Sequence, residues 1–375
     1  MGNGTVTIAQ GGTIGTSDIA INGSNLTIGG TIQDGTATKL RKQQAGALTL
    51  AGSNTLTGGV ILQTGTLNIN NAGALGSGTF VYEGGAFDNT SGSAITLSSN
   101  NTQTWSNNPV FTGSNDLDMG TGAVNAGLSR NVTVNGSKLS LGGISSTGFI
   151  NKLGVGTLAV NGASSYTGTT TVSAGTLLVN SSHTGGAAYS VSNGGTLGGA
   201  GSITTASSAS VTVNSGGKLA AGSSAGLAGT LAMTLGTGAL DVSGAVGGAN
   251  TGALLFDLAA TGASDKISLV SGSLSIGSGA LNWNDFTFAT LGGFDNGVYT
   301  LFDTSSAITG TLGSTLSGSI GTGGTGVLSF ANANNDLILT VTGVVPEPST
   351  FALALISCGF ALAVWTRKRR AASHS

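Results

Sequence analysis

The chain has 375 residues, a formal net charge of −2 and 67 glycines, while charged residues make up 7% of it and aromatic residues 5%. Twelve lysines and arginines in a chain of this length cannot form a continuous phosphate-binding stripe, which excludes a nucleic-acid-binding protein. One cysteine and two histidines exclude an intrachain disulfide and leave almost no transition-metal ligands, so we expect neither cofactor nor metal site. With these classes excluded, the composition predicts an ordered β protein whose turns are rich in Gly, Ser, Thr and Asn.

The first ten residues do not have the pattern of an export leader. A secretory signal peptide begins with basic residues followed by an apolar stretch, whereas residues 1–10 read Met-Gly-Asn-Gly-Thr-Val-Thr-Ile-Ala-Gln. This segment is typical of the middle of a strand-rich repeat, and a repeat array normally begins with a distinct cap. We therefore expect the natural start of the protein to lie upstream of Met1. The alternative is that the protein is not exported and that its C-terminal segment has no sorting role.

Two stretches of the chain, 46–70 and 156–180, align with each other from end to end without gaps. A shorter period is also present, because Gly-x-Leu triplets begin at positions 156, 175, 195 and 217. Each unit has a glycine corner, a short alternating strand and a polar turn. Residues that correspond in the two long copies include Gly52 and Gly162, Gly65 and Gly175, and, just ahead of them, Lys42 and Lys152.

A single strand of four or five residues cannot bury its apolar side or satisfy its edges. Stacking successive units does both, since every backbone group then pairs with the coil above or below. We therefore predict an all-β fold, a parallel, right-handed β-helix or β-solenoid over residues 1–264, with the clearest repeats at 40–80 and 150–205. A tandem of β-sandwiches is the alternative, and it would require hairpins between paired strands and a more aromatic core.

The two long copies resemble the autotransporter-associated β-strand repeat, which occurs in secreted passenger domains of Gram-negative bacteria. The pattern Gly-Thr-Leu-x-Leu-x-Gly-x-Asn-x-Tyr-Thr-Gly-Gly-Thr-Thr-Val-x-x-Gly-Thr-Leu-x-Val is closely matched. The first copy departs from it at Leu56, where the pattern has tyrosine, and the second at Ser164, where it has asparagine. The resemblance implies an exported solenoid.

An enzyme on such a scaffold would need clustered carboxylates or bases. Asp116 and Asp118 are the close acidic pair of residues 1–345, and their spacing places both on one face of a strand, where they would hold calcium or act on a sugar. Two turn aspartates are the simpler interpretation. His183 follows a strand and is expected to be an exposed loop residue. We assign no catalytic residue.

Three further motifs in the sequence suggest a site or an exposed surface. Residues 39–42, Lys-Leu-Arg-Lys, are expected to form a solvated loop ahead of the first repeat. Residues 321–326 satisfy the dinucleotide-binding pattern, but a strand-like segment follows them in place of the helix that a phosphate site needs. Threonine rows such as 169–171 would stack across coils and bind ordered water, as in ice-binding proteins, or polysaccharide; otherwise threonine is there as a good strand former.

Residues 265–344 differ from the rest of the body. Their strands alternate more regularly, and they contain seven of the chain's 19 aromatic residues, a higher density than in the rest of the body. We expect them to form the terminal coils and cap of the solenoid, where large side chains close the core. A small separate β domain is the alternative.

The C-terminal segment, 345–375, has the pattern of a membrane anchor. Residues 351–365 are uncharged and mostly apolar, which predicts a short transmembrane helix over about 350–366. Cys358 lies inside this span, where it would pack in lipid or accept an acyl chain. By the positive-inside rule, the cationic end would stay in the cytoplasm and the body would lie across the membrane. The cations that would stop the segment in the membrane are Arg367, Lys368, Arg369 and Arg370.

Just before the apolar run lie Pro346, Glu347 and Pro348, whose prolines hold the backbone extended and exclude a strand. The order of Pro-Glu-Pro, apolar span and basic end resembles the PEP-CTERM sorting signal of Gram-negative bacteria. The resemblance implies that an exosortase-type membrane enzyme recognises and cleaves the segment near these three residues.

Together these observations predict a non-catalytic, exported surface or matrix protein with an adhesive role, anchored in the membrane before processing and found at the cell surface or outside the cell after it. Its expected partners are the exosortase-type enzyme, the membrane and polysaccharide, with no nucleic acid. Two alternatives remain. One is a β-helix polysaccharide lyase or hydrolase that would use Asp116, Asp118 and a cation, and the other is an ice-binding or glycan-binding protein that would use threonine rows.

Overall fold

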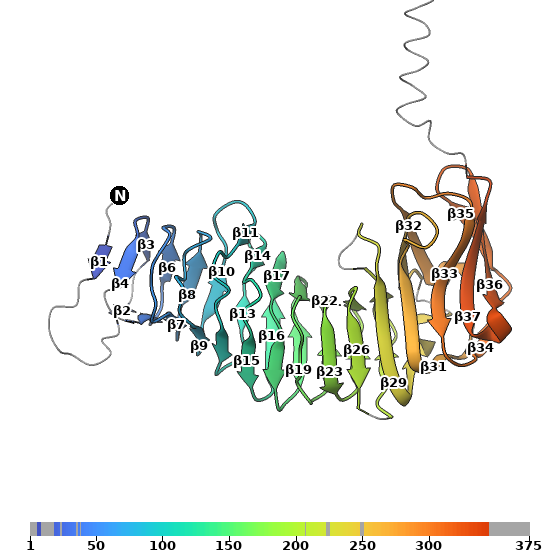
Figure 1. Ribbon diagram of the computed structural model, residues 1–375, viewed down its shortest axis with the longest axis horizontal. Helices are drawn as coiled ribbons and strands as arrows, with labels where there is room; N and C mark the ends of the chain where they lie inside the picture. The colour runs from blue at the N-terminus through green and yellow to red at the C-terminus, as the bar shows by residue number, and fades with distance from the viewer. Residues whose placement is uncertain are drawn as a thin grey trace, which may run out of the picture.

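Short strands of this chain stack side by side into an elongated β-solenoid, with successive coils following one another along the long axis (Figure 1). The computed structural model describes residues 6–8, 19–22, 25–34, 37, 39–206, 208–222, 226–247 and 251–344. In this part of the chain the strands from β2 to β32 pair in parallel, which confirms the predicted parallel β-solenoid and rules out the tandem of sandwiches for these coils.

The coils contribute strands to three sheets that run along the axis. The first sheet contains β2 (Ile19–Asn22), β5 (Leu40–Gln43), β7 (Val60–Leu62), β9 (Phe80–Tyr82), β12 (Gln103–Trp105), β15 (Val124–Gly127) and β18 (Ile144–Ser146). The second sheet contains, in its parallel part, β3 (Leu26–Ile28), β6 (Ala47–Leu50), β8 (Thr66–Ile69), β10 (Ala86–Asp88), β13 (Val110–Phe111), β16 (Arg130–Val134), β19 (Ile150–Leu153), β21 (Thr170–Val172), β24 (Tyr189–Val191), β27 (Val211–Val213), β29 (Thr230–Asp241), β31 (Lys266–Leu281) and β34 (Thr309–Leu312). The third sheet contains β11 (Ile95–Thr96), β14 (Leu117–Asp118), β17 (Lys138–Leu141), β20 (Thr157–Val160), β22 (Gly175–Val179), β25 (Gly195–Gly198), β28 (Lys218–Ala220), β30 (Leu254–Leu258) and β32 (Phe286–Thr290).

The Gly-x-Leu triplets mark successive coils of the third sheet, as their spacing predicts. Leu158 pairs with Leu177, Leu177 with Leu197, and Leu197 with Leu219. All four leucines are at most 2% exposed and belong to one continuous apolar core. The alternation of inward leucine with outward polar residues therefore sets which side of each strand faces the core.

The first and second sheets merge towards the C-terminal end. β23 (Ser182–Gly186) and β26 (Ser202–Thr205) continue the line of the first sheet, since Ser164 bridges to His183 and the Ser165 N–H donates to the Ile144 carbonyl at 2.9 Å. β26 pairs with the first half of β29, and β27 pairs with its second half. The long strands β29 and β31 thus pass around the corner and join both sheets (Figure 1).

The two long sequence copies keep their local contacts although they lie on different faces. The strand just ahead of the first copy, β5, belongs to the first sheet and the first strand of that copy, β6, to the second. The strand just ahead of the second copy, β19, belongs to the second sheet and the first strand of that copy, β20, to the third. In both copies one side chain of the connecting turn accepts a hydrogen bond from the previous coil. Asn54 Oδ1 accepts from the Ile32 N–H at 2.8 Å, and Ser164 Oγ accepts from the Ile144 N–H at 3.0 Å.

The last strands are antiparallel. β33 (Gly297–Thr304) pairs in parallel with β31, and β37 (Asp336–Thr342), β36 (Gly324–Ala331) and β35 (Ser317–Ile320) follow it as antiparallel neighbours. Their apolar side chains belong to the same core, and Phe302 lies 5.5 Å from Phe256 of β30 between ring centroids. The boundary predicted at 264/265 stays a prediction. The remaining short elements are β1 (Val6–Ile8), which pairs with β4 (Ile32–Asp34), and the 3₁₀ turns η1 (Ser243–Ala245), η2 (Trp283–Asp285) and η3 (Asn332–Asn334).

The predicted sorting segment and membrane anchor lie outside the described residues. This applies to Pro346, Glu347 and Pro348, to residues 350–366 with Cys358, and to 367–370. Among the residues that the structure does describe, no helix has the length and apolar character needed to span a bilayer.

Candidate functional site

The outward face of the third sheet carries a column of threonines bounded by lysines. β17, β20, β22, β25 and β28 place their first outward residues in direct register, and each of these residues alternates with a buried leucine. Adjacent members are about 4.8 Å apart, so the five positions span about 19 Å. The column consists of Lys138, Thr157, Thr176, Thr196 and Lys218.

This face is hollowed beside the threonine column. Leu178 lies on the outward side of β22, two positions after Thr176, and lines a cavity of about 330 Å³, although it is only 5% exposed. Ala220 and Leu255, paired in the next coils, continue the apolar floor. We call this cavity with the threonine column beside it the threonine hollow. It offers hydroxyls, which both donate and accept hydrogen bonds, along one side of an apolar surface.

Charged groups lie at both ends of the threonine hollow. Lys138 Nζ is 3.8 Å from Asp116 Oδ2, and both side chains are more than two-fifths exposed, so this ion pair is weak. Lys218 is exposed. Asp257 and Asp265 also line the hollow, beyond Leu255 of the apolar floor. Asp265 accepts backbone N–H groups of Gly229 (2.7 Å) and Asp257 (2.8 Å), and burial raises its pKa to about 6.

The threonine row expected at 169–171 is not present there. Thr170 is fully buried, and its hydroxyl shares a hydrogen bond of 2.7 Å with the Tyr166 hydroxyl, so only Thr171 is outward in strand β21. Thr171 pairs with Asn151 and Ser190 in the adjacent coils. The expectation of a row at this place is wrong because successive strand residues alternate between core and solvent.

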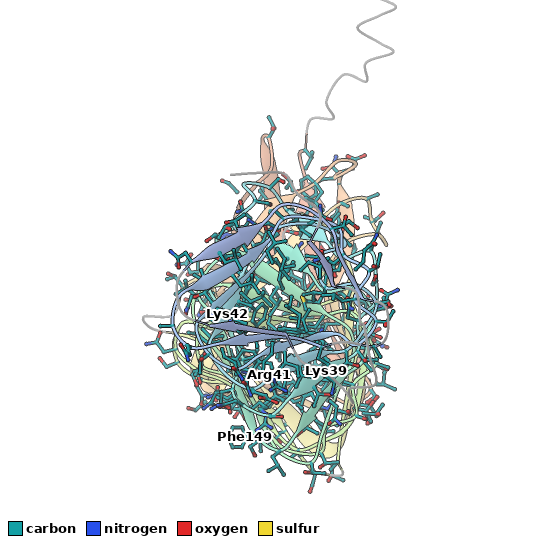
Figure 2. All side chains as sticks on the ribbon, turned by 90° about the vertical axis from the view of Figure 1, so that its left-hand side faces the viewer. Lys39, Arg41, Lys42 and Phe149 are labelled. Carbon is teal, nitrogen blue, oxygen red and sulfur yellow. The ribbon has the colours of Figure 1, made fainter. Side chains whose placement is uncertain are left out.

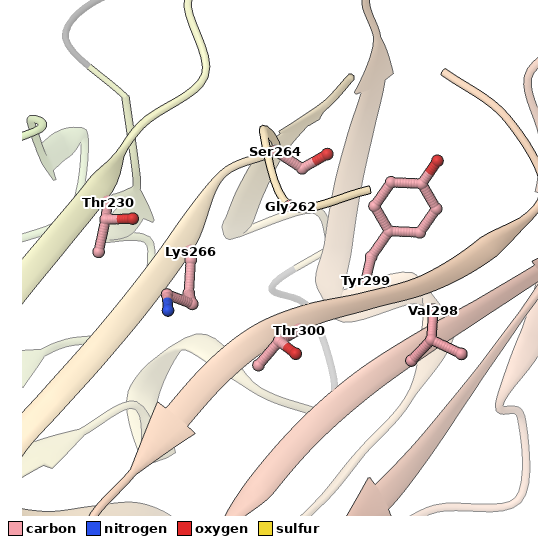
Figure 3. A pocket seen from close by; sticks show the side chains of 7 residues that line it. All are labelled: Thr230, Gly262, Ser264, Lys266, Val298, Tyr299 and Thr300. Carbon is pink, nitrogen blue, oxygen red and sulfur yellow. The ribbon is translucent and has the colours of Figure 1, made fainter. Parts of the chain in front are cut away.

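A second cavity, of about 310 Å³, lies where β33 meets β29 and β31 (Figure 3). Its ammonium group and its phenol are already engaged within the protein. Lys266 Nζ lies 3.2 Å from Asp303 Oδ2, and the Tyr299 hydroxyl donates to the Asp295 carbonyl at 2.6 Å. This cavity therefore offers fewer uncommitted groups to a ligand than the threonine hollow does.

Asp116 directly precedes strand β14 and Asp118 is the last residue of that strand, so the simpler interpretation of two turn aspartates holds for Asp116 only. Both flank the buried Leu117 and so lie on one face. Asp116 Oδ1 accepts the Lys138 backbone N–H at 2.8 Å, and Asp118 Oδ1 accepts the Gly120 N–H at 2.9 Å. In the described part of the chain, no three His, Cys, Asp or Glu residues cluster as metal ligands would.

His183 is buried, and the expectation of an exposed loop residue is wrong. It is 1% exposed in strand β23, with its ring stacked on Tyr166 at 3.9 Å between centroids. Nε2 donates to the Tyr166 carbonyl at 2.9 Å, and Nδ1 accepts the Tyr189 hydroxyl. Burial lowers the pKa of His183, so the neutral ring is favoured. The ring replaces aliphatic packing in this coil and has no access to solvent.

Residues 39–42 do not form a solvated loop, because Leu40–Gln43 is strand β5 and Lys42 is fully buried. Figure 2 looks along the axis from the N-terminal end and labels Lys39, Arg41 and Lys42 on this first part of the wall. Lys42 Nζ donates to the carbonyls of Gln43 and Gln44, both at 2.8 Å. The ammonium group thereby satisfies backbone acceptors of the tight corner that follows the strand.

Lys152, the counterpart of Lys42 in the second copy, does the same. It is fully buried, and its Nζ donates to the carbonyls of Leu153 (3.0 Å), Gly154 (2.7 Å) and Ala174 (3.1 Å). Burial lowers the pKa of Lys152 to about 8. Sequence reasoning missed these corner lysines, although two signals were available: Lys42 is two positions after inward Leu40, and the two lysines occupy equivalent positions in the aligned copies.

The glycine pattern at 321–326 forms a hairpin. Ile320 at the end of β35 pairs with Gly324 at the start of β36, and Gly321 and Gly323 have positive φ values of +56° and +74°. No helix follows, so the helix N-terminus that binds phosphate in dinucleotide sites is absent from this part of the described chain, as expected.

Three parallel sheets, an apolar interior and recurring glycine corners define the class of this protein, a parallel β-solenoid assembled from short tandem repeats. Residues 40–69 and 150–179 match the family model of the Passenger-associated-transport-repeat. These two matches contain the corner lysines Lys42 and Lys152 at the same place within each repeat. The predicted resemblance to autotransporter-associated repeats is thus confirmed for these two stretches.

One curated relative is the Adhesin BmaC autotransporter of Brucella suis biovar 1 (strain 1330). It is 32% identical over 209 aligned residues, which cover 46% of this chain. The chain spans only 5% of the length of that adhesin, so the similarity concerns a stretch of solenoid and not the whole relative.

Proposed function

We propose that this protein is a non-catalytic adhesive solenoid at the surface of a Gram-negative bacterium. The observation that carries the proposal is that two copies of a passenger-type repeat build coils of one continuous parallel solenoid. Such a rod presents long repetitive faces that suit many weak contacts better than one deep pocket. The similarity to a stretch of an autotransporter adhesin supports the same role.

The proposal includes export and sorting through the C-terminal segment. An exosortase-type enzyme would recognise Pro346, Glu347 and Pro348, a helix over about 350–366 would anchor the chain before processing, and residues 367–370 would stop it in the membrane. The order of these features in the sequence supports this part. Deleting residues 346–375 is expected to abolish envelope retention and processing, and unchanged cell fractionation would contradict it.

Adhesion is tested on the protein itself. Beads coated with the full chain are expected to adhere to polysaccharide-coated surfaces and to bacterial cells, while beads coated with an unrelated protein of similar charge do not. Equal adhesion of both kinds of bead would contradict an adhesive role. Turnover of a polysaccharide that is lost in Asp116→Ala and Asp118→Ala would instead favour a lyase or hydrolase.

A further inference from the structure

The threonine hollow is the outward surface where the structure joins regular hydroxyls, an apolar floor and charge. Thr157, Thr176 and Thr196 come from consecutive coils, and their spacing of about 4.8 Å is fixed by the backbone ladder. Because the strands on either side already use the backbone groups of β20, β22 and β25, this face offers side chains only. A ligand cannot bind here by adding a strand.

Three features of the hollow indicate the chemistry of a ligand. The hydroxyls repeat at about the length of one pyranose unit of an extended glycan and match sugar hydroxyls as both donors and acceptors. The partly exposed Ala220 and Leu255 in its floor offer an apolar surface for the C–H face of a sugar ring. Exposed Lys218 and the weakly paired Lys138, at the two ends of the threonine column, offer positive charge to carboxylates. Asp257 and Asp265 also line the hollow, but beyond Leu255 and so away from the column.

We propose that the threonine hollow binds an extended polysaccharide strand that carries uronate carboxylates. The sugar rings lie over Ala220 and Leu255, the threonines hydrogen-bond the sugar hydroxyls, and Lys218 pairs with a uronate carboxylate. A protein partner is disfavoured, because the lining of the hollow lacks the aromatic and arginine anchors on which protein interfaces depend. This inference rests on the proposed adhesive function and names the ligand class and the face that holds it.

The experiment measures binding of the purified full chain to soluble polygalacturonate oligosaccharides by calorimetry, with neutral dextran as a second probe. The triple variant Thr157→Val, Thr176→Val, Thr196→Val removes the hydroxyls while keeping good strand formers. It is expected to weaken polygalacturonate binding at least ten-fold, and Lys218→Gln is expected to weaken it about three-fold at low salt. Dextran is expected not to bind.

Matched controls come from other faces of the same protein. Thr171→Val removes an outward hydroxyl from the second sheet, and Lys39→Gln removes an exposed charge near the first repeat. Both are expected to bind polygalacturonate like the unmodified chain. Equal affinity of the triple variant and Thr171→Val, or equal binding of dextran, would overturn the proposal. Coated beads that adhere while polygalacturonate does not bind would overturn this inference and leave the adhesive function standing.

Discussion

The tight approach of successive coils at glycine corners gives a sharp prediction for Gly175→Ala. Gly175 has φ +64°, and a Cβ added there would lie only 2.5 Å from the Gly154 carbonyl oxygen, whereas ordinary contacts begin at 3.4 Å. The left-handed backbone alone costs an alanine about 1 kcal/mol. Relief of the contact requires the two coils to move apart by roughly 1 Å, which adds about 2–3 kcal/mol by analogy with overpacked cores.

Gly185→Ala is the matched control for this prediction. Gly185 also has a positive φ, +83°, but a Cβ there would meet nothing within 4 Å. The control is therefore expected to lose only about 1 kcal/mol of unfolding free energy, against about 3–4 kcal/mol for Gly175→Ala. Gly65→Ala, the counterpart in the first copy, is expected to behave like Gly175→Ala, because its added Cβ would lie 2.6 Å from the Gly46 carbonyl oxygen.

Urea unfolding of the full chain, followed by far-UV circular dichroism, measures these differences as shifts of the midpoint at constant slope. The reasoning would be refuted if Gly175→Ala and Gly185→Ala lost the same stability within about 0.5 kcal/mol. That result would mean that coil spacing adapts freely and that only the backbone conformation of the glycine matters.

Three further predictions concern buried titratable groups. The pKa of Lys152 falls from 10.5 to about 8 in the fold, so between these pH values the unfolded chain binds a proton that the folded chain does not. The unmodified chain should therefore gain unfolding free energy relative to Lys152→Gln, by up to about 1.4 kcal/mol per pH unit from pH 8 to 9.5. Urea titrations of both chains measure this difference. Burial lowers the pKa of His183, so acid below about pH 6.5 should destabilise the unmodified chain more than His183→Phe, and identical pH profiles of thermal unfolding would count against the buried ring. Burial raises the pKa of the Asp265 carboxyl group from its ordinary value of 3.8 to about 6, so between these pH values the folded chain binds a proton that the unfolded chain does not. The contribution of Asp265 to the unfolding free energy should therefore fall as the pH rises through this window. An NMR titration of this carboxyl group should find its midpoint near pH 6.

The length of the structural repeat and the parallel pairing of its strands follow from local sequence patterns. Regularly spaced Gly-x-Leu triplets, short alternating strands and glycine corners predict parallel coils, and Leu158, Leu177 and Leu197 stack as the triplets indicate. These features depend only on near neighbours in sequence, because a short strand must alternate and must find an equivalent strand in the next coil.

The predictions of side-chain exposure were wrong where they rested on residue type alone and not on the position of the residue within its coil. Lys42 and His183 are polar and were expected to be solvated, yet each occupies an inward position. Lys42 donates to carbonyls of the corner that directly follows its own strand, whereas His183 donates to the Tyr166 carbonyl of the preceding coil. Burial of a polar group is tolerated only where such partners are supplied. For His183 the supply depends on which segment is stacked beside it, and that is a tertiary property.

The repeat period, the inward direction of the leucines and the positions of tight corners can be predicted from the amino-acid pattern, because all three follow from steric and hydrophobic preferences within one coil. The faces that the two repeat copies occupy, and the column of Thr157, Thr176 and Thr196 beside a hollow, cannot be predicted in this way. Successive coils differ in length, so the lateral register of the strands emerges only when all the coils are stacked.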